Sequence, residues 1–282
     1  MNVLRYTAFS RHPAGGNPAG VVLDATGADP QGMLEVAAEV GFSETAFLFP
    51  LGDDDFDVRY FSPKAEVPFC GHATIATAVA LAEGHGPGTI RLNTRSGLVT
   101  VRTRQDPSGM TATLTSVPPR VVALPTEDQR ALLDALRWSS ADLDPSLPPR
   151  VAYAGAWHPI IAVAERERLA VLDYDFATLE ALMAHRGWTT VDLVWRAAEK
   201  VFHSRNPFPP GGVVEDPATG AAAAAFGGYL RELAVLPLSA TVTVLQGHDL
   251  GRPSELTVRI PEEPGSGISV TGHAVALDVA PG

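Results

Sequence analysis

Glu44 is one of three side chains whose type and surroundings suit proton transfer. It lies in Gly41-Phe-Ser-Glu-Thr-Ala-Phe, after a glycine that ends a predicted helix and before an apolar strand. Because Phe42 and Phe47 are close in sequence, the carboxylate is expected to be partly buried, which favours its protonated form and suits a general base. The other interpretation is a solvated carboxylate at a strand edge.

His72 and Asp216 lie at two similar helix starts, Gly71-His-Ala-Thr and Asp216-Pro-Ala-Thr-Gly, each followed by an alanine-rich segment. The helix dipole disfavours a cation at this end, so His72 is expected to be mainly neutral. Asp216 is expected to be the N-cap of a helix over residues 217–233. An uncovered first turn also attracts a carboxylate ligand. Both side chains are open to structural roles as well, as a buried histidine and a simple cap.

The two helix starts belong to an internal repeat with a spacing of about 145 residues. Val58-Arg-Tyr-Phe-Ser-Pro precedes the first start, and Val201-Phe-His-Ser-Arg precedes the second. We therefore predict two half-domains, residues 1–118 and 119–272, with the C-terminal strand 273–282 as a candidate to complete the first. Predicted strands outnumber predicted helices and do not alternate with them, which favours an α+β fold.

Composition excludes several classes of function. The net charge of −11, with no basic stripe, argues against nucleic acid and anionic membranes as partners. Cys70 is the single cysteine, so an intramolecular disulfide and a structural zinc site built on thiolates are excluded. No phosphate loop, dinucleotide fingerprint or paired histidine spacing is present, and we expect neither cofactor nor metal. The N-terminus reads as a strand and not as a signal peptide, which predicts a cytoplasmic protein.

The motifs together resemble one family. Pro13-Ala-Gly-Gly-Asn-Pro-Ala-Gly, Gly41-Phe-Ser-Glu-Thr-Ala-Phe, Cys70-Gly-His-Ala-Thr, Glu215-Asp-Pro-Ala-Thr-Gly and Gly251-Arg-Pro-Ser are similar to those of the PhzF-like proteins. That family is named for an isomerase of phenazine biosynthesis and is related to diaminopimelate epimerases. The resemblance implies two pseudo-symmetric half-domains, each a β-barrel-like sheet around a central α-helix, with the active site in the cleft between them. It also implies a homodimer.

The resemblance assigns roles to individual residues. Glu44 would carry the proton, and His72 and Asp216 would complete the catalytic set. The expected substrate-binding residues are Asn17, Ser43, Gly71, Ala73, Thr219, Gly220 and Ala221. The related epimerases have two catalytic cysteines, at the positions of Cys70 and Thr219, so two-cysteine epimerisation is not expected here. Many family members have Ser or Asn where this chain has Ala221.

These expectations converge on a cofactor-independent isomerase that shifts a proton on a small carboxylate substrate by acid/base catalysis. Two alternatives remain open from the sequence. One is a racemase or epimerase of a small amino or hydroxy acid that uses Glu44 and Asp216. The other is a non-catalytic protein that binds small acids.

Overall fold

The computed structural model describes residues 1–277, and the chain divides into two units. Unit 1 is Met1–Thr115 with the returning segment that begins at Thr271, and unit 2 is Ser116–Val270. The predicted half-domains 1–118 and 119–272 stay a prediction, and residues 278–282 of the predicted returning strand lie outside the described part. No helix among the described residues combines the length and the apolar character needed to cross a membrane.

Eight strands of unit 1 close into a ring. They are β1 (Leu4–Ala8), β2 (Asn17–Val22), β3 (Glu44–Pro50), β4 (Asp55–Phe61), β6 (Thr89–Thr94), β7 (Gly97–Asp106), β8 (Gly109–Thr115) and β17 (Ser269–Ala276). They pair in this order, and β17 pairs back onto β1. The short β5 (Glu66–Val67) pairs with β4 outside the ring order. A closed ring leaves none of these eight strands with a free edge.

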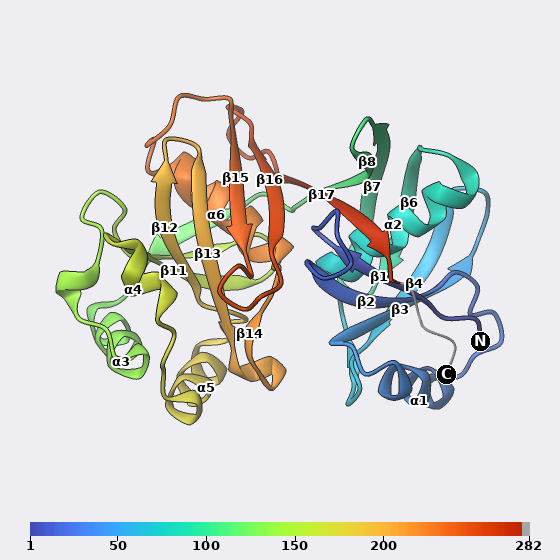
Figure 1. Cartoon of the computed structure of the whole chain (residues 1–282), viewed down its shortest axis with the longest axis horizontal. Helices are drawn as coiled ribbons and strands as arrows, with labels where there is room; N and C mark the ends of the chain where they lie inside the picture. The colour runs from blue at the N-terminus through green and yellow to red at the C-terminus, as the bar shows by residue number, and fades with distance from the viewer. Residues whose placement is uncertain (278–282) are drawn as a thin grey trace. The chain divides into compact units, whose positions relative to one another are not determined.

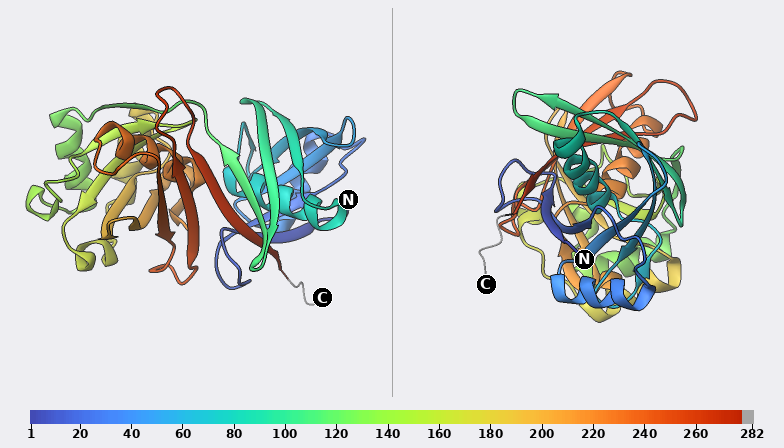
Figure 2. Two further views of the ribbon diagram at one scale, coloured as in Figure 1. Left: turned by 90° about the horizontal axis from the view of Figure 1, so that it is seen from above. Right: turned by 90° about the vertical axis from the view of Figure 1, so that its right-hand side faces the viewer.

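Helix α2 (Gly71–His85) runs through this barrel (Figures 1 and 2). Every residue from His72 to Ala82 is buried, and a helix that is apolar on all sides is a core helix. Its alanine, threonine and valine side chains are small, so strands on several sides can approach it. Helix α1 (Pro30–Val40) lies outside the strands, where Met33 packs with Phe47 and Phe61.

Unit 2 repeats this plan with additional helices. Its strands are β9 (Arg120–Ala123), β10 (Arg150–Tyr153), β11 (Trp157–Val163), β12 (Asp192–Ala198), β13 (Val201–Phe208), β14 (Val213–Asp216), β15 (Ala240–Gln246) and β16 (Ser254–Ile260). Its helices are α3 (Thr126–Leu136), α4 (Arg166–Ala170), α5 (Phe176–Arg186) and α6 (Gly220–Glu232), with 3-10 turns η1 (Ser140–Asp142) and η2 (Pro209–Gly211). Helix α6 is buried from Ala222 to Leu230 and packs on β9, β10, β11 and β16. It is therefore the counterpart of α2.

The strand pairings of the two units match. In unit 1, β2 runs parallel to β3, β3 antiparallel to β4, β4 parallel to β6, and β6 antiparallel to β7. In unit 2, β11, β12, β13, β15 and β16 pair in the same sequence of directions. The predicted α+β fold of two similar halves, each a sheet around a helix, is confirmed.

Candidate active site

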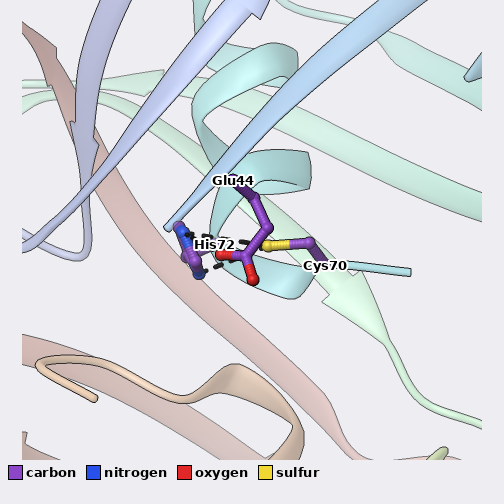
Figure 3. A group of neighbouring side chains, drawn as sticks. All are labelled: Glu44, Cys70 and His72. Carbon is purple, nitrogen blue, oxygen red and sulfur yellow. Dashed lines mark hydrogen bonds and ion pairs between the residues drawn. The ribbon is translucent and has the colours of Figure 1, made fainter. Parts of the chain in front are cut away.

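Glu44, Cys70 and His72 lie together in unit 1 (Figure 3). Glu44 is the first residue of β3, Cys70 is the N-cap of α2, and His72 is the second residue of that helix. The His72 Nε2 atom is 3.4 Å from Glu44 Oε2, and the two side chains are 7% and 15% exposed. Cys70 Sγ is 3.4 Å from His72 Nδ1. The carboxylate is thus partly buried, as predicted, and it faces an imidazole.

Two further predicted residues fix the histidine ring. Asn17 Nδ2 donates to His72 Nδ1 at 3.1 Å, so the proton of the neutral ring is on Nε2. This N–H faces Glu44 and also Ser43 Oγ, which is 3.3 Å away. The imidazole N–H is therefore directed at the Glu44 carboxylate.

The first turn of α2 supplies backbone donors beside this group. The Thr74 N–H donates to the Cys70 carbonyl, and the Cys70 side chain makes no capping hydrogen bond to the helix. The N–H groups of Gly71, His72 and Ala73 come before the first intrahelical bond, as at any helix start. Such a turn favours an anionic group. The structure therefore brings together all the site residues predicted in this half of the chain.

The predicted residues of unit 2 form a second group, but its geometry corrects one expectation. Asp216 is not the N-cap of α6: the helix begins at Gly220, and Thr219 is its N-cap. Asp216 ends β14, where it pairs with Asn206, so its backbone belongs to a strand. Its side chain accepts a hydrogen bond from Thr219 Oγ1 at 2.6 Å. Gly220 and Ala221, both partly buried, follow in the first turn of α6.

Gln246 completes this second group and is absent from the predicted residues. Its Oε1 accepts from the Thr219 N–H at 3.0 Å, and its Nε2 donates to the Asp216 carbonyl at 2.7 Å. The next residue, Gly247, has a φ of +73°, and a Cβ there would lie 2.7 Å from the Pro217 carbonyl oxygen. A glutamine that ends an alternating strand directly before a glycine is the sequence signal that could have indicated it.

Unit 2 also contains a buried polar network that includes none of the predicted site residues. Its members are His158, Thr190, Asp192, Ser204 and Asn206. Asp192 accepts from Ser204 and Asn206, and burial raises its pKa to about 6. His158 lies 2.8 Å from Thr190 Oγ1, and burial lowers its pKa to about 4. Four of these residues lie in strands, Thr190 lies just before β12, and none belongs to a recognisable motif.

A surface depression lies elsewhere in unit 1. It has a volume of about 510 Å³, and its lining includes Asp57, Arg59, Asn93 and Arg95 but none of the predicted site residues. Arg59 and Arg95 both form ion pairs with Glu66, so each guanidinium already has a carboxylate partner. A depression alone does not identify an active site.

Comparison with known proteins relates nearly the whole chain to one family. The family PhzC-PhzF, described as phenazine biosynthesis-like protein, matches residues 6–279. The uncharacterized isomerase YddE of Escherichia coli (strain K12) is 33% identical, over 98% of this chain and 96% of YddE. The trans-2,3-dihydro-3-hydroxyanthranilate isomerase of Pseudomonas fluorescens is 31% identical, over 90% of this chain and 88% of that enzyme.

Solved structures agree with this relationship. The Bacillus anthracis phenazine biosynthesis protein of the PhzF family superposes with a TM-score of 0.88 at 26% identity, covering 99% of this chain and 98% of that chain. A probable proline racemase from Agrobacterium radiobacter K84 superposes with a TM-score of 0.68 at 15% identity, covering 99% and 92%. At that identity the second similarity shows a shared fold alone.

Proposed function

The chain belongs to the PhzC-PhzF family of phenazine biosynthesis-like proteins and is an isomerase, and from this premise we propose that Glu44 moves a carbon-bound proton within a small carboxylate substrate. The observation that carries the proposal is the 3.4 Å separation of Glu44 Oε2 and His72 Nε2 at the start of α2. This distance supports the proposal because it puts a partly buried carboxylate next to a residue in the first turn of α2, and the N–H groups of such a turn suit a substrate carboxylate.

The proposed reaction is a suprafacial shift without a cofactor. Glu44 accepts a proton from an acidic C–H bond and returns it to another carbon of the same conjugated system. His72 orients the Glu44 carboxylate through its Nε2–H. Asn17 donates to His72 Nδ1 and so fixes the tautomer that carries this proton on Nε2. Charge that develops on the substrate is stabilised by donors that are already in place before the proton moves, which is the efficient form of electrostatic catalysis.

We propose that Asp216 is a second acid/base or polar group, and that Thr219, Gly220 and Ala221 contact the substrate. Asp216 is buried and receives the Thr219 hydroxyl, so its carboxylate is held in one orientation. Ala221 offers no hydroxyl, and the substrate is therefore expected to need fewer hydrogen bonds at this position than one bound through Ser or Asn. We also propose that the protein is cytoplasmic and forms a homodimer. Size-exclusion chromatography with light scattering tests the oligomeric state.

The deciding experiment is incubation of the protein in D2O with a panel of cyclic and amino carboxylates that includes trans-2,3-dihydro-3-hydroxyanthranilate. NMR then identifies exchanged C–H positions and rearranged products. An isomerase gives a product with a moved proton. Exchange with inversion at one carbon would instead indicate a racemase or epimerase, and saturable binding without exchange would indicate a non-catalytic protein.

A further inference from the structure

Glu44, Cys70 and His72 offer one carboxylate, one thiol and one imidazole whose ligand atoms all lie within 4.8 Å of one another (Figure 3). Within residues 1–277 this is the only group of three or more potential metal ligands. The ligands come from the start of β3 and from a Cys-x-His pair at the start of α2, so no spacing of ligands along the sequence indicates the group.

The distances in this group fit a tetrahedral cation. With usual zinc bond lengths of about 2.0–2.1 Å to nitrogen or oxygen and about 2.3 Å to sulfur, tetrahedral angles require ligand separations of about 3.3–3.6 Å. The His72 Nε2 atom is 3.4 Å from Glu44 Oε2 and 3.7 Å from Cys70 Sγ. Two of the three separations are therefore close to those of a bound ion. Cys70 Sγ lies 3.4 Å from His72 Nδ1 as well, so it faces the ring, and ion binding requires a rotation about the Cys70 Cα–Cβ bond that brings the sulfur to the Nε2 edge beside Glu44.

We propose that these three side chains form a binding site for Zn²⁺ that engages the carboxylate of Glu44. A thiolate with an imidazole is a donor set that selects Zn²⁺ over Mg²⁺ or Ca²⁺. Three protein ligands leave a fourth position for water or for the nearby Ser43 hydroxyl. This site goes beyond the proposed function, because it concerns a ligand that the isomerisation does not use.

Binding requires a defined proton balance. The Cys70 thiol releases its proton to solvent as the S–Zn bond forms, so affinity falls as the pH is lowered. The proton of His72 moves from Nε2 to Nδ1 through solvent, which frees the Nε2 lone pair. In the structure the Asn17 amide donates to His72 Nδ1. A rotation of this amide by half a turn would present Asn17 Oδ1 to the new Nδ1–H. Asn17 thereby becomes the outer-shell partner that orients a metal-bound histidine.

The test uses the metal-free protein without substrate, so that its result does not depend on the proposed function. Titration with Co²⁺ is expected to give one equivalent bound, with a thiolate-to-metal charge-transfer band and the intense visible bands of tetrahedral cobalt. Zn²⁺ should displace the Co²⁺, since it is bound more tightly at such sites. Cys70→Ala should lose the charge-transfer band. Glu44→Gln and His72→Gln should each weaken Zn²⁺ binding at least about tenfold, and Asn17→Leu should weaken it about 10–100-fold.

His248→Ala is the matched control, because His248 and His203 form a separate histidine pair in unit 2 with ring centres 5.5 Å apart. This variant should bind Zn²⁺ as the unaltered protein does. Should a variant fail to fold, X-ray absorption of the unaltered zinc protein decides: one sulfur at about 2.3 Å with nitrogen or oxygen at about 2.0–2.1 Å is expected. A shell without sulfur, or Zn²⁺ binding that is lost in His248→Ala, would overturn the proposal.

Discussion

Asp192 occupies in unit 2 the register position that Glu44 occupies in unit 1. Glu44 is the first residue of β3, which pairs in parallel with β2, and Ala19 lies opposite it. Asp192 is the first residue of β12, which pairs in parallel with β11, and Ile160 lies opposite it. The two carboxylates nevertheless have different surroundings. Glu44 is partly exposed and faces His72, whereas Asp192 is 2% exposed and accepts from Ser204 and Asn206. One half of the repeat therefore keeps a carboxylate accessible, and the other encloses it in a structural network.

The Asp192 network predicts two opposing effects of pH on stability. The folded-state pKa of Asp192 is raised to about 6, so the stability it contributes is complete below its ordinary pKa and is lost as pH rises through about 6. The folded-state pKa of His158 is lowered to about 4, so its contribution is complete above its ordinary pKa and is lost as pH falls toward about 4. Each amounts to roughly 3 kcal/mol, and between pH 4 and 6.5 they offset each other.

Single substitutions should separate these effects. In Asp192→Asn the His158 effect acts alone, and the free energy of unfolding should fall more steeply than in the unaltered protein as pH is lowered from 6.5 to 4. In His158→Gln the Asp192 effect acts alone, and the free energy should rise over the same change. Urea unfolding at a series of pH values measures both. Parallel curves for the three proteins would contradict the assignment.

We predict that Gly227→Ala in α6 destabilises the protein, although alanine generally favours helices more than glycine does. A Cβ at Gly227 would lie 2.7 Å from Ile268 and 2.9 Å from Val258, inside the core of unit 2. Overpacking of this kind costs about 1–3 kcal/mol. Gly84 in α2 is the matched control, since nothing lies within 4 Å of a Cβ placed there. Gly84→Ala should stabilise by about 0.5–1 kcal/mol. Thermal unfolding of both variants checks the prediction, and equal shifts would refute it.

The fold was more predictable than the details of the site. The repeat was visible because the glycine, proline and alanine punctuation around His72 and Asp216 recurs in order. The equivalence of Glu44 and Asp192 was not visible, because Phe42-Ser-Glu and Thr190-Val-Asp share no motif and only strand register relates them. The cap at Asp216 was predicted wrongly, since an Asp-Pro pair before an alanine-rich segment is typical of a helix start. Here a pairing with Asn206 keeps it in β14.

The hydrogen bond from Thr219 to Asp216 allows a test of how strongly the orientation of the Asp216 carboxylate affects the reaction rate. Thr219→Val keeps the shape of the side chain but removes the hydroxyl that donates to Asp216 Oδ2 and accepts from Gln246 Nε2. The loss of the hydrogen bond to Asp216 should cost about 1 kcal/mol of stability. We expect a larger effect on the reaction, about tenfold in kcat/KM, because a misplaced acid or base transfers protons less efficiently. Thr219→Ser retains the donor and should recover most of the rate. If the valine variant is as active as the serine variant, Asp216 does not need this contact.

Glu44→Gln is expected to preserve folding and ligand binding while abolishing proton transfer. The amide keeps the volume of the carboxylate, and its oxygen still accepts from His72, so the free energy of unfolding should change little. Removal of an acid–base group typically lowers the rate by about 10²–10⁴-fold, and for a sole base that moves a carbon-bound proton we expect the upper end. Substrate affinity should persist through the first turn of α2 and Asn17. Isomerisation and deuterium incorporation should disappear together, because one residue removes and returns the proton.

Glu66→Gln provides the matched control for this experiment. Glu66 is a carboxylate of the same unit with a side-chain exposure of 14%, against 15% for Glu44, but it pairs with Arg59 and Arg95. Its substitution should lower stability by breaking those ion pairs and leave C–H exchange near the unaltered rate. If Glu44→Gln exchanges the substrate proton as fast as Glu66→Gln does, Glu44 is not the base. His72 and Asp216, the other two residues of the predicted catalytic set, would then be the candidates for the base.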